Sequence, residues 1–337
     1  MHANTSGYNR HGAVNILNAG DCLLENLTVA DNDSIGLHVN GNNNRIEDCE
    51  FGYNGQLGLA VKGDGNHIKR ISSHHNNTRN FGMDWEAGGV KCMGTVPFTN
   101  GSIEDSVFFN NMGDGIWFDT YNDNVTITNV VCAHNEGHGL HYELSYRAAI
   151  RDSKFFKNKK RGIYLSSSAE CTVENNEIYF NDYEGLAVIN DLNRKENVKI
   201  PFGESHHKFI DNLCGWNCRS YGNIIREIAF TSKKPDASGI IEAYDELSES
   251  DGNIYFKESG VRLQLTARKK TVNHDKWTEM TNQDAHSLYF SAPVTEELEK
   301  ECNREVSLDL LDSFNARSII AETVRHNEPE KFSADSG

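Results

Sequence analysis

A glycine-led pentad that returns about every 23 residues is the feature that most limits how this chain can fold. The copies are "GAVNI" from Gly12, "GLHVN" from Gly36, "GLAVK" from Gly58, "GVKCM" from Gly89, "GIWFD" from Gly115, "GLHYE" from Gly139, "GIYLS" from Gly162 and "GLAVI" from Gly185. Successive glycines are 24, 22, 31, 26, 24, 23 and 23 residues apart. Short alternating segments with this period are typical of a solenoid, in which each coil buries its apolar residues against its neighbours. The sequence therefore predicts an all-β, right-handed parallel β-helix with coils of about 22–26 residues.

A recurring asparagine supports this fold. It stands four residues before the pentad glycine in six copies, as Asn32, Asn54, Asn111, Asn135, Asn158 and Asn181. Asparagine tolerates left-handed backbone angles, and stacked asparagine side chains form hydrogen-bonded ladders. We therefore expect one asparagine at a corner of each coil. The period is too short for a four-stranded propeller blade, and the leucine pattern of leucine-rich repeats is absent.

The alternation of side chains along a strand divides each pentad into two columns. The first and third residues after each glycine are apolar and should point inward, as Leu37/Val39, Leu59/Val61, Ile116/Phe118, Leu140/Tyr142 and Ile163/Leu165. The second and fourth should point outward, as His38/Asn40, Ala60/Lys62, Lys91/Met93, Trp117/Asp119, His141/Glu143 and Tyr164/Ser166. Solvent-facing strands usually carry small polar residues, so this outward column is a candidate functional surface.

Asp119 and Glu143 occupy the same outward position on consecutive coils. Adjacent coils stack at about 4.8 Å, which predicts carboxyl groups roughly 5 to 6 Å apart. That separation is typical of a retaining glycosidase, in which one carboxylate attacks the sugar and the other donates a proton. Two like charges this close also separate in proton affinity, so that one can act as the acid and the other as the nucleophile at one pH.

The neighbours of the two acids suit a sugar site. We expect Trp117, His141 and Lys91 to contact the substrate, because aromatic rings stack on the C–H faces of pyranoses. Further contacts are expected from Tyr164, Lys62 and His38 on the same outward face. The alternative is a solvated strand face that carries two acids by chance.

The coil between Gly58 and Gly89 is longer than its neighbours, and the excess is "TRNFGMDWEAGG". Loops on one face of a solenoid commonly form its binding side. We expect this loop to wall the groove and to bring Asp84, Trp85 and Glu86 to the substrate. The alternative is an excursion without a role.

The net charge of −16 argues against nucleic acid or an anionic membrane as the partner. No apolar stretch is long enough for a membrane-spanning helix, and "MHANTSGYNRHG" lacks the apolar centre of a signal peptide. An extracellular or periplasmic location is expected only if the chain is truncated.

The eight cysteines are scattered and are expected to be buried free thiols. The spacing of Cys214 and Cys218 leaves a disulfide or a metal site open.

The period blurs towards the C-terminus. We expect a β-helix over residues 1–290 with an irregular excursion at 191–250, a helical cap over the open end of the stack at 291–325, and a mobile tail at 326–337. The repeats begin almost at once, so a second subunit or another element could cover the N-terminal end. The oligomeric state stays open.

The segments "WEAGGVK", "GIWFD" and "LHYELSYRAAIRDSKFFKN" resemble bacterial β-helix proteins of carbohydrate-active type. The acid pair is similar to that of the β-xylosidases of glycoside hydrolase family 120. This resemblance implies that Asp119 is the nucleophile and Glu143 the general acid/base. The chain departs from that family after the glutamate, where it has Leu-Ser-Tyr-Arg in place of Val-Asn-His-Gly, and it has no room for the family's β-sandwich insertion.

Two other patterns are expected to be structural. "GHG" at residues 137–139 is similar to a polygalacturonase motif, but the paired aspartates of those enzymes are not recognisable, so we assign no role to His138. "HDKWTEMTNQDAHSLYF" resembles the segment that closes many carbohydrate-active β-helices. That resemblance places Asp284 and His286 in a closing turn.

The sequence favours a retaining glycoside hydrolase that requires no metal or other cofactor and acts on a carbohydrate. One alternative is a polysaccharide lyase, in which Lys62, Lys91 or His141 is the base and calcium neutralises a uronate. The other is a β-helix that binds sugar without catalysis. The fold is compatible with all three functions.

Overall fold

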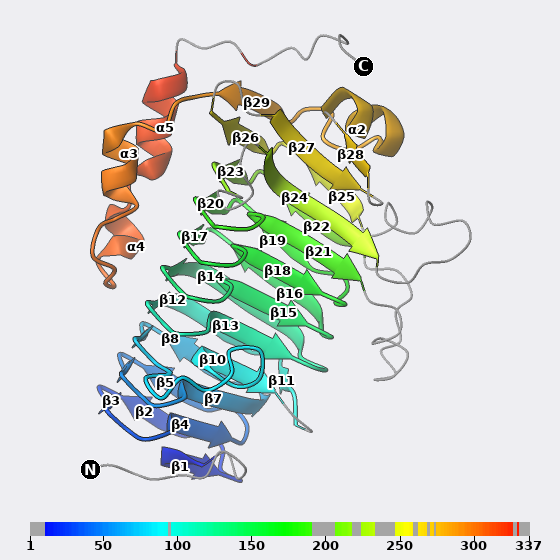
Figure 1. The fold of residues 1–337 in the computed structure, drawn as a ribbon. Coiled ribbons are helices and arrows are strands. Elements are labelled where there is room, and N and C mark those ends of the chain that lie inside the picture. Colours follow the sequence, from blue (N-terminus) through cyan, green and yellow to red (C-terminus); the bar gives the residue numbers. More distant parts are fainter. Residues whose placement is uncertain are drawn as a thin grey trace.

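The chain winds as a right-handed parallel β-helix whose coils stack along one axis (Figure 1). The computed structural model describes residues 11–93, 96–190, 206–217, 224–232, 247–258, 262–267, 270–272, 274–325 and 329. Strands of successive coils pair in parallel, as β13 does with β15 and β15 with β18. The predicted fold class is therefore confirmed.

The coils form three faces, of which the first carries the pentads. Its strands are β1 (Gly12–Leu17), β4 (Ile35–Asn40), β7 (Leu57–Asp64), β10 (Gly88–Met93), β13 (Asp114–Asp119), β15 (Leu140–Glu143), β18 (Ile163–Ser166), β21 (Leu186–Asn190), β24 (Ile224–Ser232) and β27 (Arg262–Ala267). A short strand, β28 (Lys270–Val272), pairs antiparallel with β27 at the end of this face.

The other two faces share their longest strands. The second face contains β2 (Leu23–Glu25), β5 (Arg45–Glu47), β8 (His67–Lys69), β12 (Ser102–Phe109), β14 (Asp123–Ala133), β16 (Tyr146–Arg151), β19 (Thr172–Glu174), β22 (His207–Ile210) and β25 (Leu247–Asp251). The third contains β3 (Thr28–Ala30), β6 (Glu50–Gly52), β9 (Ser72–His74), β17 (Lys154–Phe156), β20 (Glu177–Tyr179), β23 (Leu213–Gly215), β26 (Ile254–Lys257) and β29 (Leu288–Ser291). β12 and β14 belong to both faces, because each pairs with two strands of the next or previous coil. β11 (Phe98–Thr99) bridges β7 and β14.

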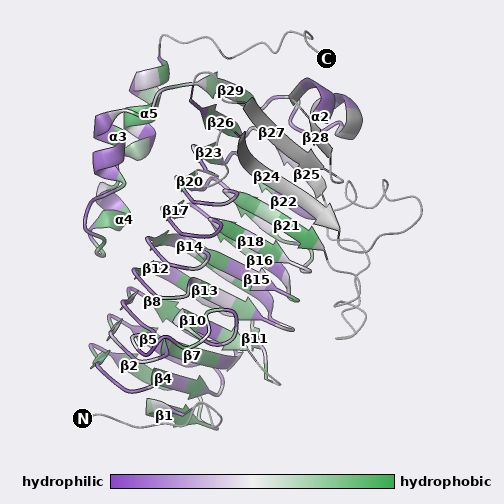
Figure 2. Ribbon diagram, in the orientation of Figure 1, coloured by the Kyte–Doolittle hydropathy of each residue, from purple (hydrophilic) through white to green (hydrophobic). Residues whose placement is uncertain are grey.

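The inward column of the pentads forms the core, as the alternation predicts. Leu37, Leu59, Ile116, Leu140 and Ile163 are all fully buried and belong to one core cluster that continues from coil to coil. Figure 2 shows hydrophobic residues along the strands and hydrophilic residues at many of the turns between them. Because every coil buries its apolar residues only against its neighbours, the register of the pentads is fixed along the stack.

The expected asparagine ladder is present, and it is longer than the sequence pattern indicates. Each side-chain amide donates to the Oδ1 atom of the next asparagine at 2.9–3.0 Å, through Asn32, Asn54, Asn76, Asn111, Asn135, Asn158, Asn181 and Asn217. The expectation that the corner asparagine itself takes the left-handed backbone angle is wrong. The left-handed backbone angle belongs to the residue before the asparagine, such as His134 with a φ of 57°. The asparagine serves to satisfy buried backbone groups at the corner.

Three C-terminal helices lie along the flank of the stack, and this differs from the expected cap over its open end (Figure 1). They are α3 (Glu296–Glu301), α4 (Leu310–Ser313) and α5 (Ala316–Val324). Their apolar residues pack on outward-facing apolar side chains of the third face, among them Val131 and Phe156. At the C-terminal end, α2 (His274–Thr281) instead places Trp277 in the inner core.

The closing turn has the structural role that the resemblance implies. Asp284 is buried and accepts hydrogen bonds from Trp277, Ser250 and Ser287. His286 lies on the surface, 2.6 Å from Asp251.

Several expectations fall on residues 1–10, 191–205, 218–223, 233–246 and 330–337, which lie outside the described residues. They include the contact at the N-terminal end, much of the excursion at 191–250, Cys218 and most of the tail. The seven cysteines that the structure describes are free thiols. Among the described helices, none is long and apolar enough to cross a membrane.

The ladder predicts a large effect for Asn135→Ala. The Asn135 side chain accepts from the backbone and side chain of Asn111 at 3.1 and 3.0 Å, and donates to the carbonyl of Phe108 at 3.0 Å. Leaving these buried groups unsatisfied should lower the free energy of unfolding by about 3 kcal/mol. Urea denaturation measures this, with the exposed Asn42→Ala as the control. Equal stability of the two variants would contradict a stabilising role for the ladder.

Candidate active site

Asp119 and Glu143 lie side by side on the pentad face. They are the last residues of β13 and β15, and they are direct partners in the register of the two strands. Both line a cavity of about 520 Å³. The structure therefore pairs the two acids on adjacent coils, as the repeat predicts.

The cavity lies over β10, β13, β15 and β18 and is walled by the loop before β10. Its lining residues are Met83, Asp84, Trp85, Lys91, Met93, Asp114, Trp117, Asp119, His138, His141, Glu143, Tyr164 and Ser166. Eight of the eleven predicted site residues are among them. Glu86, Lys62 and His38 are not.

The outward column is mostly buried, which the sequence did not suggest. Lys91 is 2% exposed and Trp117 is 5% exposed. The Lys91 ammonium lies 3.2 Å from the centroid of the Trp117 ring. The rings of Trp117 and His141 stack at 4.9 Å, and those of His141 and Tyr164 at 4.7 Å. These spacings match the distance between strands, so the register itself builds a continuous stack of planar groups.

Asp119 is held by a buried cation. Its Oδ2 lies 3.2 Å from the Lys91 ammonium, and its Oδ1 accepts from the Thr120 hydroxyl at 2.8 Å. The same ammonium donates to the backbone carbonyl of Trp85 in the loop. Burial lowers the pKa of Lys91, and the charge of Asp119 opposes that shift. Lys91 therefore ties the loop to the Asp119 carboxylate.

Glu143 lies in a different environment. Its side chain is 7% exposed, and its Oε2 accepts a hydrogen bond from the indole nitrogen of Trp117 at 3.0 Å. The Nε2 atom of His141 lies 3.8 Å from the same oxygen. The two acids are thus in contact with different groups, a lysine for Asp119 and an indole and an imidazole for Glu143.

Asp114 and His138 also line the cavity, and the sequence analysis assigned no role to either. Asp114 Oδ2 lies 3.1 Å from His141 Nδ1, and its Oδ1 accepts from the backbone N–H of His138 at 2.6 Å. His138 Nδ1 accepts from the backbone N–H of Arg161 at 3.2 Å. Burial, together with the neighbouring His141, lowers the pKa of His138 well below its ordinary value, so this ring is neutral at pH 7.

A signal for these residues is present in the repeat. The residue before the pentad glycine is apolar in the early copies, as Ile35 and Leu57, and becomes Asp114, His138, Arg161 and Glu184 in later ones. This residue stands one position before the pentad, whose five residues were the basis of the prediction. Asp114 and His138 were therefore not predicted as site residues.

The loop between β9 and β10 reaches along the stack. Asp84 forms a 2.7 Å ion pair with Lys160, which lies in the turn before β18. Met83, Asp84 and Trp85 line the cavity, and Trp85 is 72% exposed. The loop therefore walls the cavity alongside the two coils that carry the acids, as expected.

Three predicted contacts lie outside the cavity. His38 is separated from Lys91 in the outward column by Ala60, which pairs with both. Lys62 belongs to β7 and pairs with Asn40 of β4. β7 precedes β10, which is the first pentad strand that lines the cavity. Glu86 is buried, and its negative charge acts on the pKa of Lys91.

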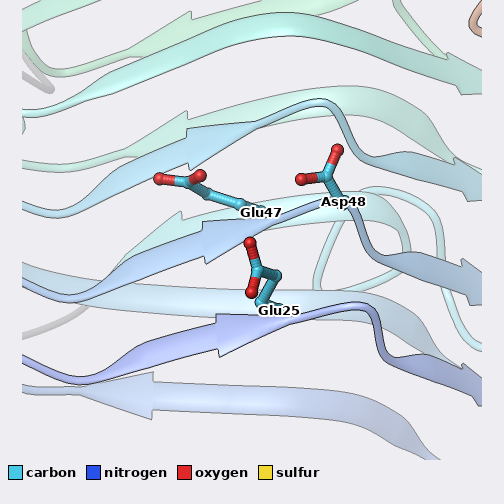
Figure 3. Close-up of side chains that lie close together, drawn as sticks. All are labelled: Glu25, Glu47 and Asp48. Carbon is cyan, nitrogen blue, oxygen red and sulfur yellow. The ribbon is translucent and has the colours of Figure 1, made fainter.

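Among the described residues, one group has the spacing of a metal site, and it lies far along the stack from the cavity. Figure 3 shows Glu25, Glu47 and Asp48, which come from β2 and the end of β5. Arg45 and Arg70 each donate at 2.7 Å to these acids, and they lower the pKa of Glu47 and Asp48. Arginines therefore already pair with two of the three acids of this group. The described carboxylates of the cavity form no comparable group.

The buried lysine leads to a stability prediction. Lys91→Met removes the cation from a buried pair and leaves Asp119 without its charge partner, which should lower the free energy of unfolding by about 3 kcal/mol. Lys69→Met is the matched control, because Lys69 is 38% exposed in its pairs with Glu104 and Asp105. Chemical denaturation of both variants measures the difference. A Lys91 variant as stable as the control would contradict a buried ion pair.

The neutral His138 predicts a pH dependence of stability. Below its ordinary pKa of 6.5, the unfolded chain takes up a proton that the folded ring resists. The free energy of unfolding should therefore fall as the pH drops below 6.5, by up to about 1.4 kcal/mol per pH unit from this residue.

His138→Asn tests this pH dependence, since an asparagine oxygen can still accept from the Arg161 backbone. The stability of wild type relative to the variant should decrease between pH 7 and pH 5 in denaturation curves. A constant difference over that range would show that His138 titrates normally.

Several solved structures are similar to this one. The structure is similar to the A-module of the mannuronan C-5 epimerase AlgE6 from Azotobacter vinelandii, with 14% identity, a TM-score of 0.48, and coverage of 80% of this chain and 75% of that one. It is also similar to the pectate lyase Pel9A, with 15% identity, a TM-score of 0.42, and coverage of 65% and 57%. A third similar structure is the DFA-IIIase from Arthrobacter chlorophenolicus A6 without its lid, with 12% identity, a TM-score of 0.45, and coverage of 77% and 61%.

No curated protein sequence matches the chain at a significant level. A family match is present, to the family described as right handed beta helix region, and it spans residues 12–178. These residues include β1 to β19 and all the strands that line the cavity. The family match therefore covers about half of the chain, including the strands that carry Asp119 and Glu143.

Proposed function

We propose that the protein is a retaining glycoside hydrolase in which Asp119 is the nucleophile and Glu143 the general acid/base. The observation that carries this proposal is the direct pairing of the two carboxylates in one cavity, each with a different partner. Such a pair provides two carboxyl groups with two roles, as retaining glycosidases require.

The role of Asp119 follows from Lys91. A nucleophilic carboxylate must be held in a fixed direction, and the Lys91 ammonium lies 3.2 Å from one oxygen of Asp119. Because Lys91 also binds the loop carbonyl of Trp85, the cation is held in place while the carboxylate reacts. The nucleophile is then oriented before the substrate arrives.

The role of Glu143 follows from its burial among rings. Its carboxyl group is shielded from bulk water by the Trp117 and His141 rings and lines the cavity, where it can transfer a proton to a glycosidic oxygen. The Trp117 indole N–H at 3.0 Å fixes the orientation of the group.

The reaction then proceeds in two steps. A carboxylate oxygen of Asp119 attacks the anomeric carbon while Glu143 gives its proton to the departing glycosidic oxygen, which forms a glycosyl ester on Asp119. Glu143 then takes a proton from water, and the oxygen of that water attacks the anomeric carbon and releases Asp119. Two inversions give net retention of configuration.

The cavity suits an uncharged sugar. Among its lining residues are four carboxylates, from Asp84, Asp114, Asp119 and Glu143, and one lysine. That lysine, Lys91, is already paired with Asp119, so the described lining offers an anionic sugar no lysine or arginine that is not already paired. The exposed Trp85 ring offers a face on which a pyranose can stack.

A second candidate is a polysaccharide lyase, and the Asp114–His141 pair favours it. A histidine held by a carboxylate at 3.1 Å is a suitable general base for removing a proton next to a uronate carboxyl group. This chemistry also needs a cation to neutralise the uronate. Lys91 is committed to Asp119, so we place the lyase second.

Activity on nitrophenyl glycosides tests the first proposal, beginning with xylosides and arabinofuranosides. Asp119→Asn and Glu143→Gln should each lower kcat/KM by roughly 10²–10⁴-fold, because each removes a group that acts in the transition state. The matched controls are Asp152→Asn and Glu174→Gln, which change exposed carboxylates. Azide should restore turnover of the Glu143 variant and yield a glycosyl azide of retained configuration.

Equal activity of wild type and both site variants would contradict the assignment. An increase in double-bond absorbance on uronate polymers with calcium, lost in His141→Gln and kept in Glu143→Gln, would establish the lyase instead. Sugar binding that survives loss of both acids, without turnover of any substrate, would identify a non-catalytic binding protein.

A further inference from the structure

Asp114 is a buried acid in the cavity that the two-step reaction does not use. It begins β13, whereas Asp119 ends it, and it is 4% exposed. Its two oxygens contact His138 and His141. A buried carboxylate is costly unless it is hydrogen-bonded, so these two contacts account for how it is tolerated.

We propose that Asp114 is a positioning residue that fixes the tautomer of His141 and thereby keeps the proton of Glu143 available to the leaving group. This inference rests on the proposed role of Glu143 as the general acid. It adds two residues, Asp114 and His141, to the machinery of that step.

The tautomer follows from the hydrogen bonds of Asp114. An ionised carboxylate only accepts. Its Oδ1 accepts the backbone N–H of His138 at 2.6 Å, and its Oδ2 lies 3.1 Å from His141 Nδ1. Nδ1 must therefore carry a hydrogen, so that in the neutral ring the lone pair lies on Nε2.

The tautomer matters because the Nε2 atom of His141 faces Glu143. Nε2 lies 3.8 Å from Glu143 Oε2, and the imidazole is clamped between the rings of Trp117 and Tyr164. With the hydrogen on Nδ1, the neutral ring presents no N–H to Glu143. In the other tautomer, an N–H would point at that carboxyl group and stabilise its ionised form, so that less of it would carry the proton that the leaving group needs.

The titratable groups that face His141 are Asp114, Glu143, His138 and Tyr164. Burial keeps the pKa of His138 well below its ordinary value, so His138 adds no charge at pH 7. Arg161, the nearest arginine in the same column, is paired with Glu184 at 2.8 Å.

Asp114→Asn is the informative variant. It keeps the shape of the side chain but replaces the oxygen that accepts from His141 Nδ1 by an amide group that donates. The asparagine oxygen can still accept from the His138 backbone, while its amide would donate to His141 Nδ1. The hydrogen of His141 should then move to Nε2. Glu184→Gln is the matched control, since Glu184 holds the same position three coils later and lies outside the cavity lining.

The tautomer is read directly by ¹⁵N NMR of the full chain labelled at histidine, with the His141 signals assigned from His141→Gln. We expect the Nδ1–H form in wild type and in Glu184→Gln, and the Nε2–H form in Asp114→Asn. An Nε2–H ring in wild type overturns the proposal without any variant. An Nδ1–H ring retained in Asp114→Asn overturns it as well.

The effect of Asp114 on proton donation by Glu143 is measured with substrates that differ in their leaving group. A dinitrophenyl glycoside needs little protonation to depart, whereas a phenyl glycoside needs it. Asp114→Asn should lower kcat/KM about 10-fold or more for the phenyl glycoside and less than about 3-fold for the dinitrophenyl glycoside. Equal losses for both would overturn the link to Glu143.

These two measurements separate the inference from the proposed function. A wild type that hydrolyses no glycoside would refute the hydrolase, and with it the stated role of the tautomer in acid catalysis. The NMR spectra would still decide whether Asp114 fixes the His141 ring.

Discussion

The in-register stacking of coils is the constraint on which the rest of this structure depends. Parallel pairing places equivalent residues of successive coils one strand spacing apart, about 4.8 Å. The same repeat aligns the inward apolar column, the asparagine ladder and the outward column of Lys91, Trp117, His141 and Tyr164. Planar side chains at that spacing stack on one another, so a regular backbone produces an organised surface without a separate scaffold.

The stacking also explains why charged groups can be buried in the outward column. Lys91 is covered by the loop before β10, by the Trp117 ring and by Asp119, and its charge is balanced there. A solenoid accepts a longer turn easily because each coil contacts only its neighbours. The extra residues of that one coil therefore wall the cavity without disturbing the register on either side.

Electrostatic asymmetry arises from these packed columns. Asp119 and Glu143 occupy equivalent positions, yet the coil before Asp119 supplies a lysine, and the coil before Glu143 supplies the indole of Trp117. An equivalent backbone position thus acquires two chemical environments through its neighbours. A repeat protein can make an active site in this way, by varying side chains within a constant frame.

The sequence by itself determined the period, the inward column and the pairing of Asp119 with Glu143, because these depend on alternation and repeat length alone. It placed most of the cavity residues for the same reason. Only the tertiary structure decided that the outward column is buried, that His38 and Lys62 are outside the cavity, and that Asp114 and His138 belong to it. It also placed the C-terminal helices on the flank of the stack. These features depend on turns, loops and side-chain packing. The repeat period does not specify the positions of residues in such segments.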